Sequence, residues 1–195
     1  MMKKICALLL ALCLTLTAAT ALAATQDINF GDFTIPLDPE TPGKMVDKEE
    51  GQVLMTIYPA YLTNGDSASN FNAAWESTTI DIASQNMSAV KDGVDSFVES
   101  VLNELETVNV GVSDFDLLDY GKTEVDGLAA IYMVISYTAD YSGMGEEYKG
   151  MVMPLFQKCV IVSGSFGTYT FTATCLDMDT MNQFMNPIFD SIRWN

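Results

Sequence analysis

The stretch YGKTEVDGLAAIYMVISY, from Tyr120 to Tyr137, reads as two strands joined by the dipeptide Asp126-Gly127. An Asp-Gly pair between apolar runs is typical of a type I′ hairpin turn, in which both central residues need a positive φ angle. The second strand is apolar on both faces, since Leu128 and Ala130 alternate with equally apolar neighbours. Such a strand is typical of a sheet covered on both sides. We therefore expect it at the centre of the sheet, with no exposed face that could carry a catalytic residue.

The same reading extends through the second half of the chain as a series of hairpins. We predict strands over 114–124, 128–141, 148–162 and 168–176, joined by tips at 126–127, 142–147 and 164–167. The last strand places Tyr169, Phe171, Ala173 and Cys175 on one face and four threonines on the other. Because threonine is polar, we expect that second face to be wet or lightly covered.

Helical spacing occurs in two other places. Apolar residues from Val90 to Leu105 recur at intervals of three and four, which predicts an amphipathic helix over 88–108. A closing helix begins after Asp177 or Asp179, either of which can cap it, and Pro187 should kink or split it. Earlier strands are predicted at 33–37, 53–62 and 71–82. The fold class is therefore α+β, an antiparallel β-sheet meander packed with helices on its faces.

Six segments occur in a characteristic order: Phe33–Leu37, the mid-chain helix, Leu118–Ala130, Val160–Gly164, Tyr169–Ala173 and Phe189–Arg193. In these segments and their order the chain resembles the PsbP-like fold family and, within it, the bacterial DcrB-like envelope proteins. The sequence departs from the family after Pro36, where a Gly-Trp pair is usual and Asp-Pro-Glu-Thr-Pro-Gly43 stands instead.

The resemblance implies an α/β/α sandwich and a non-catalytic binding or assembly module. Family members bind photosystem subunits or a small GTPase, or are envelope proteins of uncertain role. No catalytic or cofactor-binding residue is carried over, because the family offers no catalytic motif to match. A protein of the cell envelope is the expected partner.

The first 23 residues have the three parts of a secretory signal peptide: the basic Lys3 and Lys4, an apolar run, and a small-x-small end at Ala21 and Ala23. We expect cleavage before Ala24 and a single domain over 24–195. Retention as a membrane anchor is the alternative, although the apolar run of about a dozen residues is shorter than the roughly 20 that a spanning helix needs. A lipoprotein signal at Cys13 is a third reading, which Leu12 disfavours because that signal has Gly or Ala there. After cleavage we expect an exported protein with no membrane span.

Charge excludes some partners. Cleavage removes two of the nine basic residues, and the remaining seven stand against 26 acidic ones, a net charge near −19. Such a surface repels nucleic acid and anionic lipid headgroups. It favours cationic partners, and it also keeps an exported protein soluble.

Cys159 and Cys175 remain after cleavage, and two cysteines in an exported protein invite a disulfide. If Gly164 pairs with Gly167, however, Cys159 faces Thr172 and Cys175 faces Phe156, so the two sulfurs point to opposite sides of the sheet. A bridge would need a bulge. Both a bridge and buried free thiols stay open.

The sequence has no histidine, which excludes Ser-His and Cys-His nucleophile pairs and zinc sites built on His. A Ser-Lys hydrolase is formally possible, but we expect none of the lysines to belong to such a pair. A glycosidase-like pair of carboxylates is conceivable, and the abundance of acidic residues makes any one pair uninformative. We therefore predict no enzyme, no cofactor and no metal.

Calcium binding is the more serious alternative. Asp114, Asp116 and Asp119, and separately Asp177 and Asp179, offer oxygens at close spacing, although neither run is an EF-hand loop. In a regular strand Asp119 would point away from the other two.

Two apolar groups have both a functional and a structural interpretation. Met178, Met181 and Met185 share one helical face and could hold copper(I), but core packing is the simpler role. Trp75, Tyr58 and Tyr61 lie near strand ends and could line a groove or pack as core aromatics.

Overall fold

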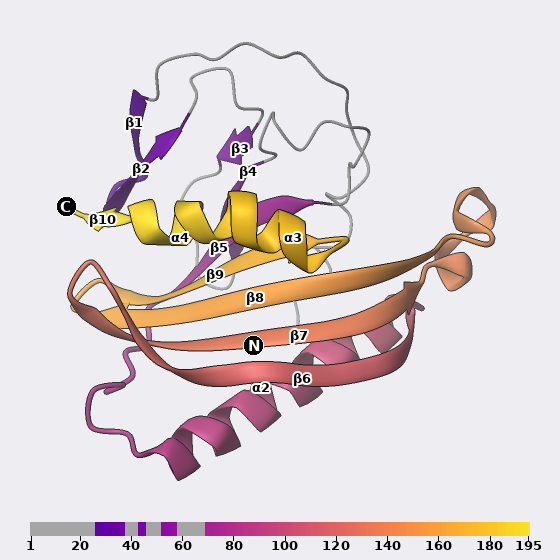
Figure 1. Cartoon of the computed structure of the whole chain (residues 1–195), viewed down its shortest axis with the longest axis horizontal. Helices are drawn as coiled ribbons and strands as arrows, with labels where there is room; N and C mark the ends of the chain where they lie inside the picture. The colour runs from indigo at the N-terminus through magenta and orange to yellow at the C-terminus, as the bar shows by residue number, and fades with distance from the viewer. Residues whose placement is uncertain (1–25, 38–42, 46–51, 58–68) are drawn as a thin grey trace.

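The computed structural model describes residues 26–37, 43–45, 52–57 and 69–195. They form an α+β fold of two antiparallel sheets, with helices on the faces of the larger one, as the sequence predicts (Figure 1). The small sheet has the order β1-β2-β10, and the large sheet has the order β3-β4-β5-β9-β8-β7-β6. The small sheet consists of β1 (Gln26–Asn29), β2 (Phe33–Leu37) and β10 (Arg193–Trp194). The large sheet consists of β3 (Gly43–Met45), β4 (Gln52–Ile57), β5 (Asn70–Glu76), β6 (Gly111–Val125), β7 (Leu128–Asp140), β8 (Val152–Gly164) and β9 (Gly167–Cys175).

The hairpin of β6 and β7 has the predicted turn at Asp126-Gly127. Asp126 has φ 48° and Gly127 has φ 82°, so both central residues are left-handed. Val125 pairs with Leu128 directly across the turn, which sets the register of the whole hairpin. The turn therefore accounts for the choice of both residues.

The position of β7 in the sheet differs from the prediction. The middle strand of the large sheet is β9, whereas β7 lies between β8 and the edge strand β6. One face of β7 is buried, including Ile131 and Met133, but Tyr132 and Val134 on the other face are only half-buried. The predicted central place is thus wrong, but β7 is paired on both sides and no residue from Leu128 to Ala139 is exposed, as the prediction requires. Apolar residues on both faces reflect a helix on one side and a partly open cavity on the other.

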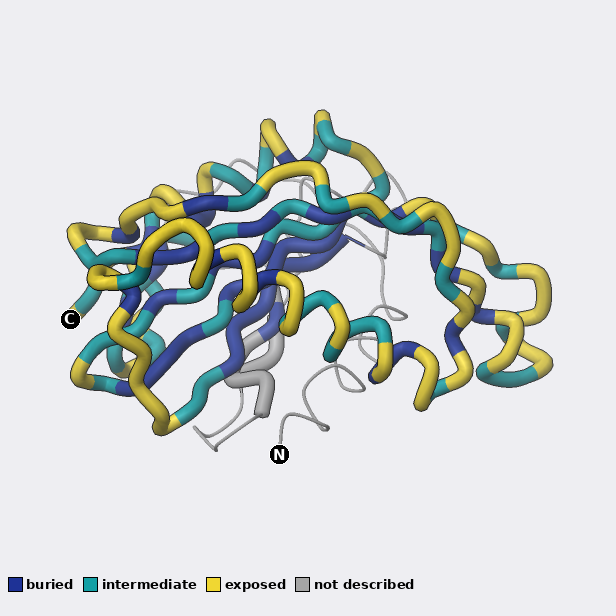
Figure 2. The backbone as a smooth tube through the Cα atoms, turned by 90° about the horizontal axis from the view of Figure 1, so that it is seen from below, coloured by how far each residue is buried: buried dark blue, intermediate teal, exposed yellow. Residues whose placement is uncertain are grey.

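Helix α2 (Met87–Thr107) confirms the predicted mid-chain helix. Asn86 caps it, since its side chain accepts a 3.0 Å hydrogen bond from the backbone N–H of Ala89. Val90 and Val94 are buried against Ile131 and Met133 of β7. Figure 2 shows α2 with its exposed outer side toward the viewer and the buried strands behind it. The helix covers the β6–β7 side of the sheet.

An irregular closing helix covers the opposite face (Figure 1). It consists of α3 (Met178–Thr180), a π-helical turn η5 (Met181–Met185) and α4 (Asn186–Ser191). Pro187 lies in the first turn of α4, directly after the π-helical turn, so the helix is irregular there, but it continues from Met178 to Ser191 and is not split into two pieces. The buried side chains of this helix pack on the Phe171 face of β9: Met181, Met185, Ile188, Phe189 and Ile192.

Several predicted boundaries shift or cannot be compared. The strand predicted to reach Ile82 ends at Glu76, and Ile82 instead packs against the start of α2 from a loop. Two short 3₁₀ turns, η3 (Ser142–Met144) and η4 (Glu146–Tyr148), precede β8, which begins at Val152 rather than at 148. The cleavage residues Ala21, Ala23 and Ala24, and the predicted strand end at 58–62, lie outside the described residues.

The two cysteines lie as the register argument requires. Cys159 pairs with Thr172 and Cys175 with Phe156, in separate core clusters on the two faces of the sheet. Both are buried thiols, and no disulfide joins them.

Candidate functional site

The main cavity candidate is a groove between α2 and the large sheet, with a volume of about 330 Å³. We call it the α2 groove. The floor of the groove is formed by β5, β9, β8 and β7. Its walls differ in chemistry: the helix wall is largely apolar, and the strand wall combines apolar side chains, such as Ile131 and Met133 of β7, with hydroxyl and amide side chains of β5, β8 and β9.

The helix wall follows from spacing. Ala89, Gly93, Phe97, Val101 and Leu105 recur every four residues and line the groove as one row. Residues four apart lie on one helix face, and this row adjoins the buried row that holds Val90 and Val94. The sequence analysis included Phe97, Val101 and Leu105 in the predicted apolar stripe but did not single out Ala89 and Gly93. The sequence feature that could have revealed this row is Gly93, a glycine in the middle of a strong helix, where alanine would be more stable.

The strand wall is built from side chains directly opposite one another. Thr172 pairs with Asn72 on β5 and with Cys159 on β8. Thr168 and Thr172 are each 5% exposed, and both line the groove. The prediction of a wet threonine face is therefore wrong, because this face lies inside the groove rather than on the outer surface. Polar residues on both strands make the wall able to donate and accept hydrogen bonds.

Charge in the groove has one sign. Glu76 and Glu104 line it, and the described lining includes no lysine or arginine. Burial raises the pKa of the Cys159 thiol to about 11, although contact with the Thr172 hydroxyl opposes the shift. The sulfur lies 3.6 Å from that hydroxyl oxygen. Cys159 is therefore a protonated thiol at neutral pH and lacks the thiolate that a nucleophile needs.

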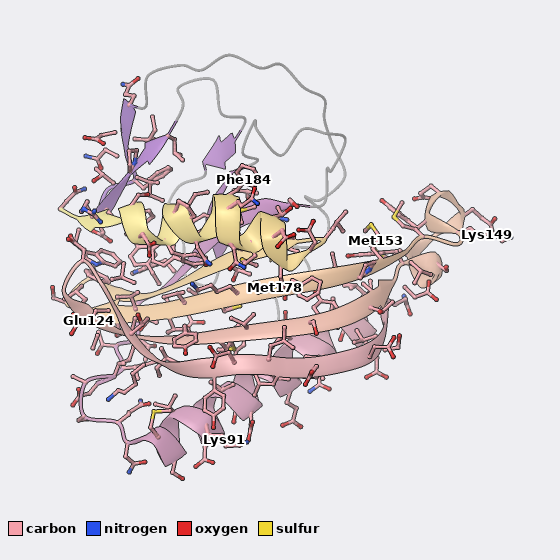
Figure 3. All side chains as sticks on the ribbon, in the orientation of Figure 1. Lys91, Glu124, Lys149, Met153, Met178 and Phe184 are labelled. Atoms are coloured by element: carbon pink, nitrogen blue, oxygen red, sulfur yellow. The ribbon has the colours of Figure 1, made fainter. Side chains whose placement is uncertain are left out.

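A second cavity, the closing-helix cleft, lies on the other face and has a volume of about 570 Å³. Figure 3 shows Glu124 near the β6–β7 turn and Met178 at the start of the closing helix, and both line the cleft. Lys158 projects into it, donates a 2.8 Å hydrogen bond to Oδ1 of Asn186 and lies 4.9 Å from the ring centre of Phe189. Burial lowers the pKa of Lys158.

Several polar side chains of the closing-helix cleft bond to one another or to the backbone. Nearby Asp190 and Asp119 act against the shift of Lys158, because a negative charge favours the ammonium. Tyr132 donates a 3.0 Å hydrogen bond to Asp119, and burial followed by that bond raises the pKa of Tyr132. Oδ2 of Asp126 accepts a 2.9 Å hydrogen bond from the backbone N–H of Trp194.

The carboxylates proposed for calcium are arranged differently from the prediction. Two bulges interrupt β6, so Asp116 lies opposite Ser136 and Asp119 lies opposite Val134, on the same face. The prediction that Asp119 points away is wrong, because each bulge inserts a residue. Asp114 has φ 52° and accepts 3.3 Å hydrogen bonds from the hydroxyls of Ser113 and Thr138. Across the described part of the chain, no group of three or more His, Cys, Asp or Glu side chains could hold a metal ion.

The remaining candidates have structural roles. Asp177 caps the closing helix, accepting hydrogen bonds of 2.7 Å from the backbone N–H of Thr180 and 2.9 Å from its hydroxyl. Asp179 is exposed in the first turn. Met181 and Met185 are buried in the core, as the packing interpretation predicts.

Trp75 is half-buried, and its indole N–H donates a 2.8 Å hydrogen bond to the carbonyl of Phe166. It packs against the core cluster around Phe171. Tyr58 and Tyr61 lie outside the described residues.

One spacing contradicts the expectation about lysines. Ser88 and Lys91 do have the Ser-x-x-Lys spacing, on the exposed side of α2 (Figure 3). Lys91 is paired with Asp95 at 2.6 Å. That contact raises the pKa of Lys91 and keeps it protonated, so it is unsuited to activate Ser88 as a base.

Neither a family model nor a curated protein matches the sequence. Among solved structures, the fold is similar to the solution structure of cyanobacterial PsbP (CyanoP) from Synechocystis sp. PCC 6803, with a TM-score of 0.57 and 13% identity, over 93% of this chain and 99% of that chain. A protein of unknown function, PA94 from Pseudomonas aeruginosa, aligns over 87% of this chain and 96% of its own at 11% identity, with a TM-score of 0.37. The TM-score of the PA94 structure is too low to support a fold comparison, and the likeness to cyanobacterial PsbP establishes the fold alone. The chain therefore has a PsbP-like α+β fold.

Proposed function

We propose that this chain is an exported, non-catalytic binding protein of the bacterial cell envelope, of PsbP-like and DcrB-like character, and that it holds a ligand in the α2 groove. The α2 groove is the observation that carries the proposal. It joins an apolar helix wall to a partly polar strand wall around about 330 Å³, within the usual range for ligand pockets of roughly 300–1,000 Å³. An envelope protein is the expected partner of the loaded chain.

The side chains near the groove support binding rather than catalysis. The sequence lacks histidine, the Cys159 thiol is held in its protonated form, and Lys91 is engaged by Asp95. The hydrolase and calcium alternatives have no observation that favours them over binding.

Export is supported by the sequence of residues 1–23, with its basic start, apolar run and small residues before Ala24. The acidic composition is compatible with an exported protein, because a high net charge keeps a protein soluble. Within the described ranges, no helix combines the length and apolar character that crossing a bilayer requires.

The test has two arms in the native host. Fractionation followed by mass spectrometry of the N-terminus should find the chain in the envelope or medium, beginning at Ala24. The variant Ala23→Gln should keep its leader, whereas Leu22→Gln, with the same new side chain at the tolerant middle position, should be processed. Cytosolic protein that still carries residues 1–23 would contradict export.

The second arm is crosslinking in intact cells followed by purification of the chain. We expect one or more envelope proteins to be recovered in fixed ratio to it. Recovery of the chain alone, at crosslinker levels that capture a known envelope complex, would contradict the assembly role.

A further inference from the structure

We propose that the ligand of the α2 groove is a small uncharged amphiphile, an unbranched alkyl chain of about ten carbons with a hydroxyl or amide head group. This inference rests on the proposed function, since it names the ligand class of the same site. It follows from the size, the two walls and the charge of the groove, taken in turn.

Size sets the first limit. The volume of about 330 Å³ lies at the lower end of the roughly 300–1,000 Å³ that is usual for ligand pockets. The groove therefore suits a slender small molecule.

The helix wall suits an alkyl chain. Phe97, Val101 and Leu105 present an apolar surface, and Gly93 in the same row leaves room beside it. A Cβ atom added at Gly93 would meet nothing within 4 Å, so packing does not require glycine there. Glycine also weakens a helix interior relative to alanine. We infer that glycine occurs at position 93 because it keeps the groove open along the helix, although it is unfavourable for the helix itself.

The strand wall suits an uncharged polar head. Asn72, Gln157, Thr170 and Thr172 carry hydroxyl and amide groups on three neighbouring cross-strand rows of the sheet. Hydroxyls and amides both donate and accept, so they match the hydroxyl or amide of a neutral head. An alkyl chain with no head group would leave this wall in contact with hydrocarbon, which is unfavourable for polar groups.

The charge of the groove excludes anionic heads. Glu76 and Glu104 line it, no lysine or arginine occurs among its described lining residues, and the sequence carries a formal net charge of −17. A carboxylate or phosphate head would meet like charge without a cation to pair with. Fatty acids and anionic phospholipids are therefore poor ligands, and a fatty alcohol or amide of the same length is a good one.

Equilibrium dialysis of radiolabelled decan-1-ol and decanoate against the purified exported protein tests the proposal at about pH 7.5, where decanoate is ionised. We expect saturable binding of decan-1-ol at one site, and binding of decanoate weaker by about tenfold or more. Gly93→Leu should reduce the affinity for decan-1-ol by about tenfold or more, because the new side chain fills the passage. Asn103→Leu adds the same side chain to the exposed side of α2 and should bind as the parent does.

The outcomes separate cleanly. Absence of saturable decan-1-ol binding, equal or tighter binding of decanoate, or parental affinity in a folded Gly93→Leu variant would each overturn the ligand class. Circular dichroism and the melting temperature of both variants establish that they fold. A negative dialysis result would contradict the ligand class but not export or the recovery of an envelope partner. Negative fractionation and crosslinking results would contradict the envelope role but not the binding of decan-1-ol. The two proposals can therefore be tested independently.

Discussion

The phenol of Tyr169 donates a 2.7 Å hydrogen bond to Oδ2 of Asp32, and this bond links the middle strand of the large sheet to the turn between β1 and β2. Phe33, next to Asp32, packs edge-on against the Tyr169 ring with 5.2 Å between ring centres. Tyr169 is fully buried. The small sheet is therefore held to the large one by a polar contact inside an aromatic cluster.

Replacing Tyr169 by Phe removes this bond and preserves the ring. A hydrogen bond to a charged group contributes about 1.5–3 kcal/mol, so we expect Tyr169→Phe to lower the free energy of unfolding by about that amount in urea titrations. Tyr148→Phe, in the η4 turn, removes a hydroxyl from a half-buried site and should change it by less than about 0.5 kcal/mol. Equal effects of the two variants would show that the link carries no stability.

Stability should fall at alkaline pH, beginning near pH 9. Burial raises the pKa of Cys159 from 9.0 to about 11 in the folded chain, while the unfolded chain keeps the ordinary value. Between those values the unfolded state binds fewer protons, so the contribution is present below about pH 9 and is lost as the pH rises to about 11. Burial, followed by the bond to Asp32, also raises the pKa of Tyr169, which extends the decline above about pH 10.

Unfolding measured from about pH 7 to 11 checks this slope. The parent should lose roughly 2–3 kcal/mol more than Cys159→Ala over the range, since two pKa units correspond to about that energy. Parallel curves for the two proteins would mean that Cys159 does not titrate differently on unfolding.

The two thiols should be chemically silent in the folded protein. Cys159 is 2% exposed and Cys175 is fully buried, and they lie in core clusters on opposite faces of the sheet. Peptide mapping after iodoacetamide treatment at about pH 8 should find neither labelled in the native state. Both should be labelled in urea without reductant. A peptide pair that becomes reactive only after reduction would reveal a disulfide and contradict the structure.

Two glycines should respond to alanine in opposite directions. Gly93→Ala meets open space in a helix interior and should stabilise the protein by about 0.5–1 kcal/mol. Gly167 has φ +107°, and a Cβ atom there would lie 2.3 Å from the carbonyl oxygen of Glu76. Gly167→Ala should therefore destabilise by about 2 kcal/mol or more. Thermal unfolding of both variants tests this prediction. Melting temperatures that change in the same direction would contradict the expected opposite effects.

Asp126 should matter for stability and not for a reaction. Its φ angle is 48°, and its carboxylate accepts the Trp194 N–H at 2.9 Å. Asp126→Asn keeps an acceptor oxygen and a residue that tolerates a left-handed backbone, so we expect a change below about 1 kcal/mol. Asp126→Ala loses both and should cost about 1–3 kcal/mol by chemical denaturation. A larger loss in the asparagine variant would imply that the negative charge itself is needed.

The sequence predicted those features that depend on local chemistry. The period of α2, the left-handed Asp126-Gly127 turn and the facing of Cys159 toward Thr172 all follow from spacing and turn geometry. The place of β7 did not follow, because an apolar strand beside a helix and a cavity has the same composition as a central one. The α2 groove could not be foreseen, since its lining comes from α2 and from four separate strands, which form one groove only after the sheet has formed.

The bulged strand β6 bears on how one copy of the protein could approach another. Among the described strands it forms one edge of the large sheet, 15 residues long, and such an edge ordinarily offers its backbone groups to a neighbouring chain. Here two bulges break the row of hydrogen-bonding groups, and Asp114, Asp116 and Asp119 place negative charge along it. An approaching second copy would meet an interrupted ladder and like charge. These carboxylates thus oppose edge-to-edge polymerisation, a role that needs neither a metal nor a substrate.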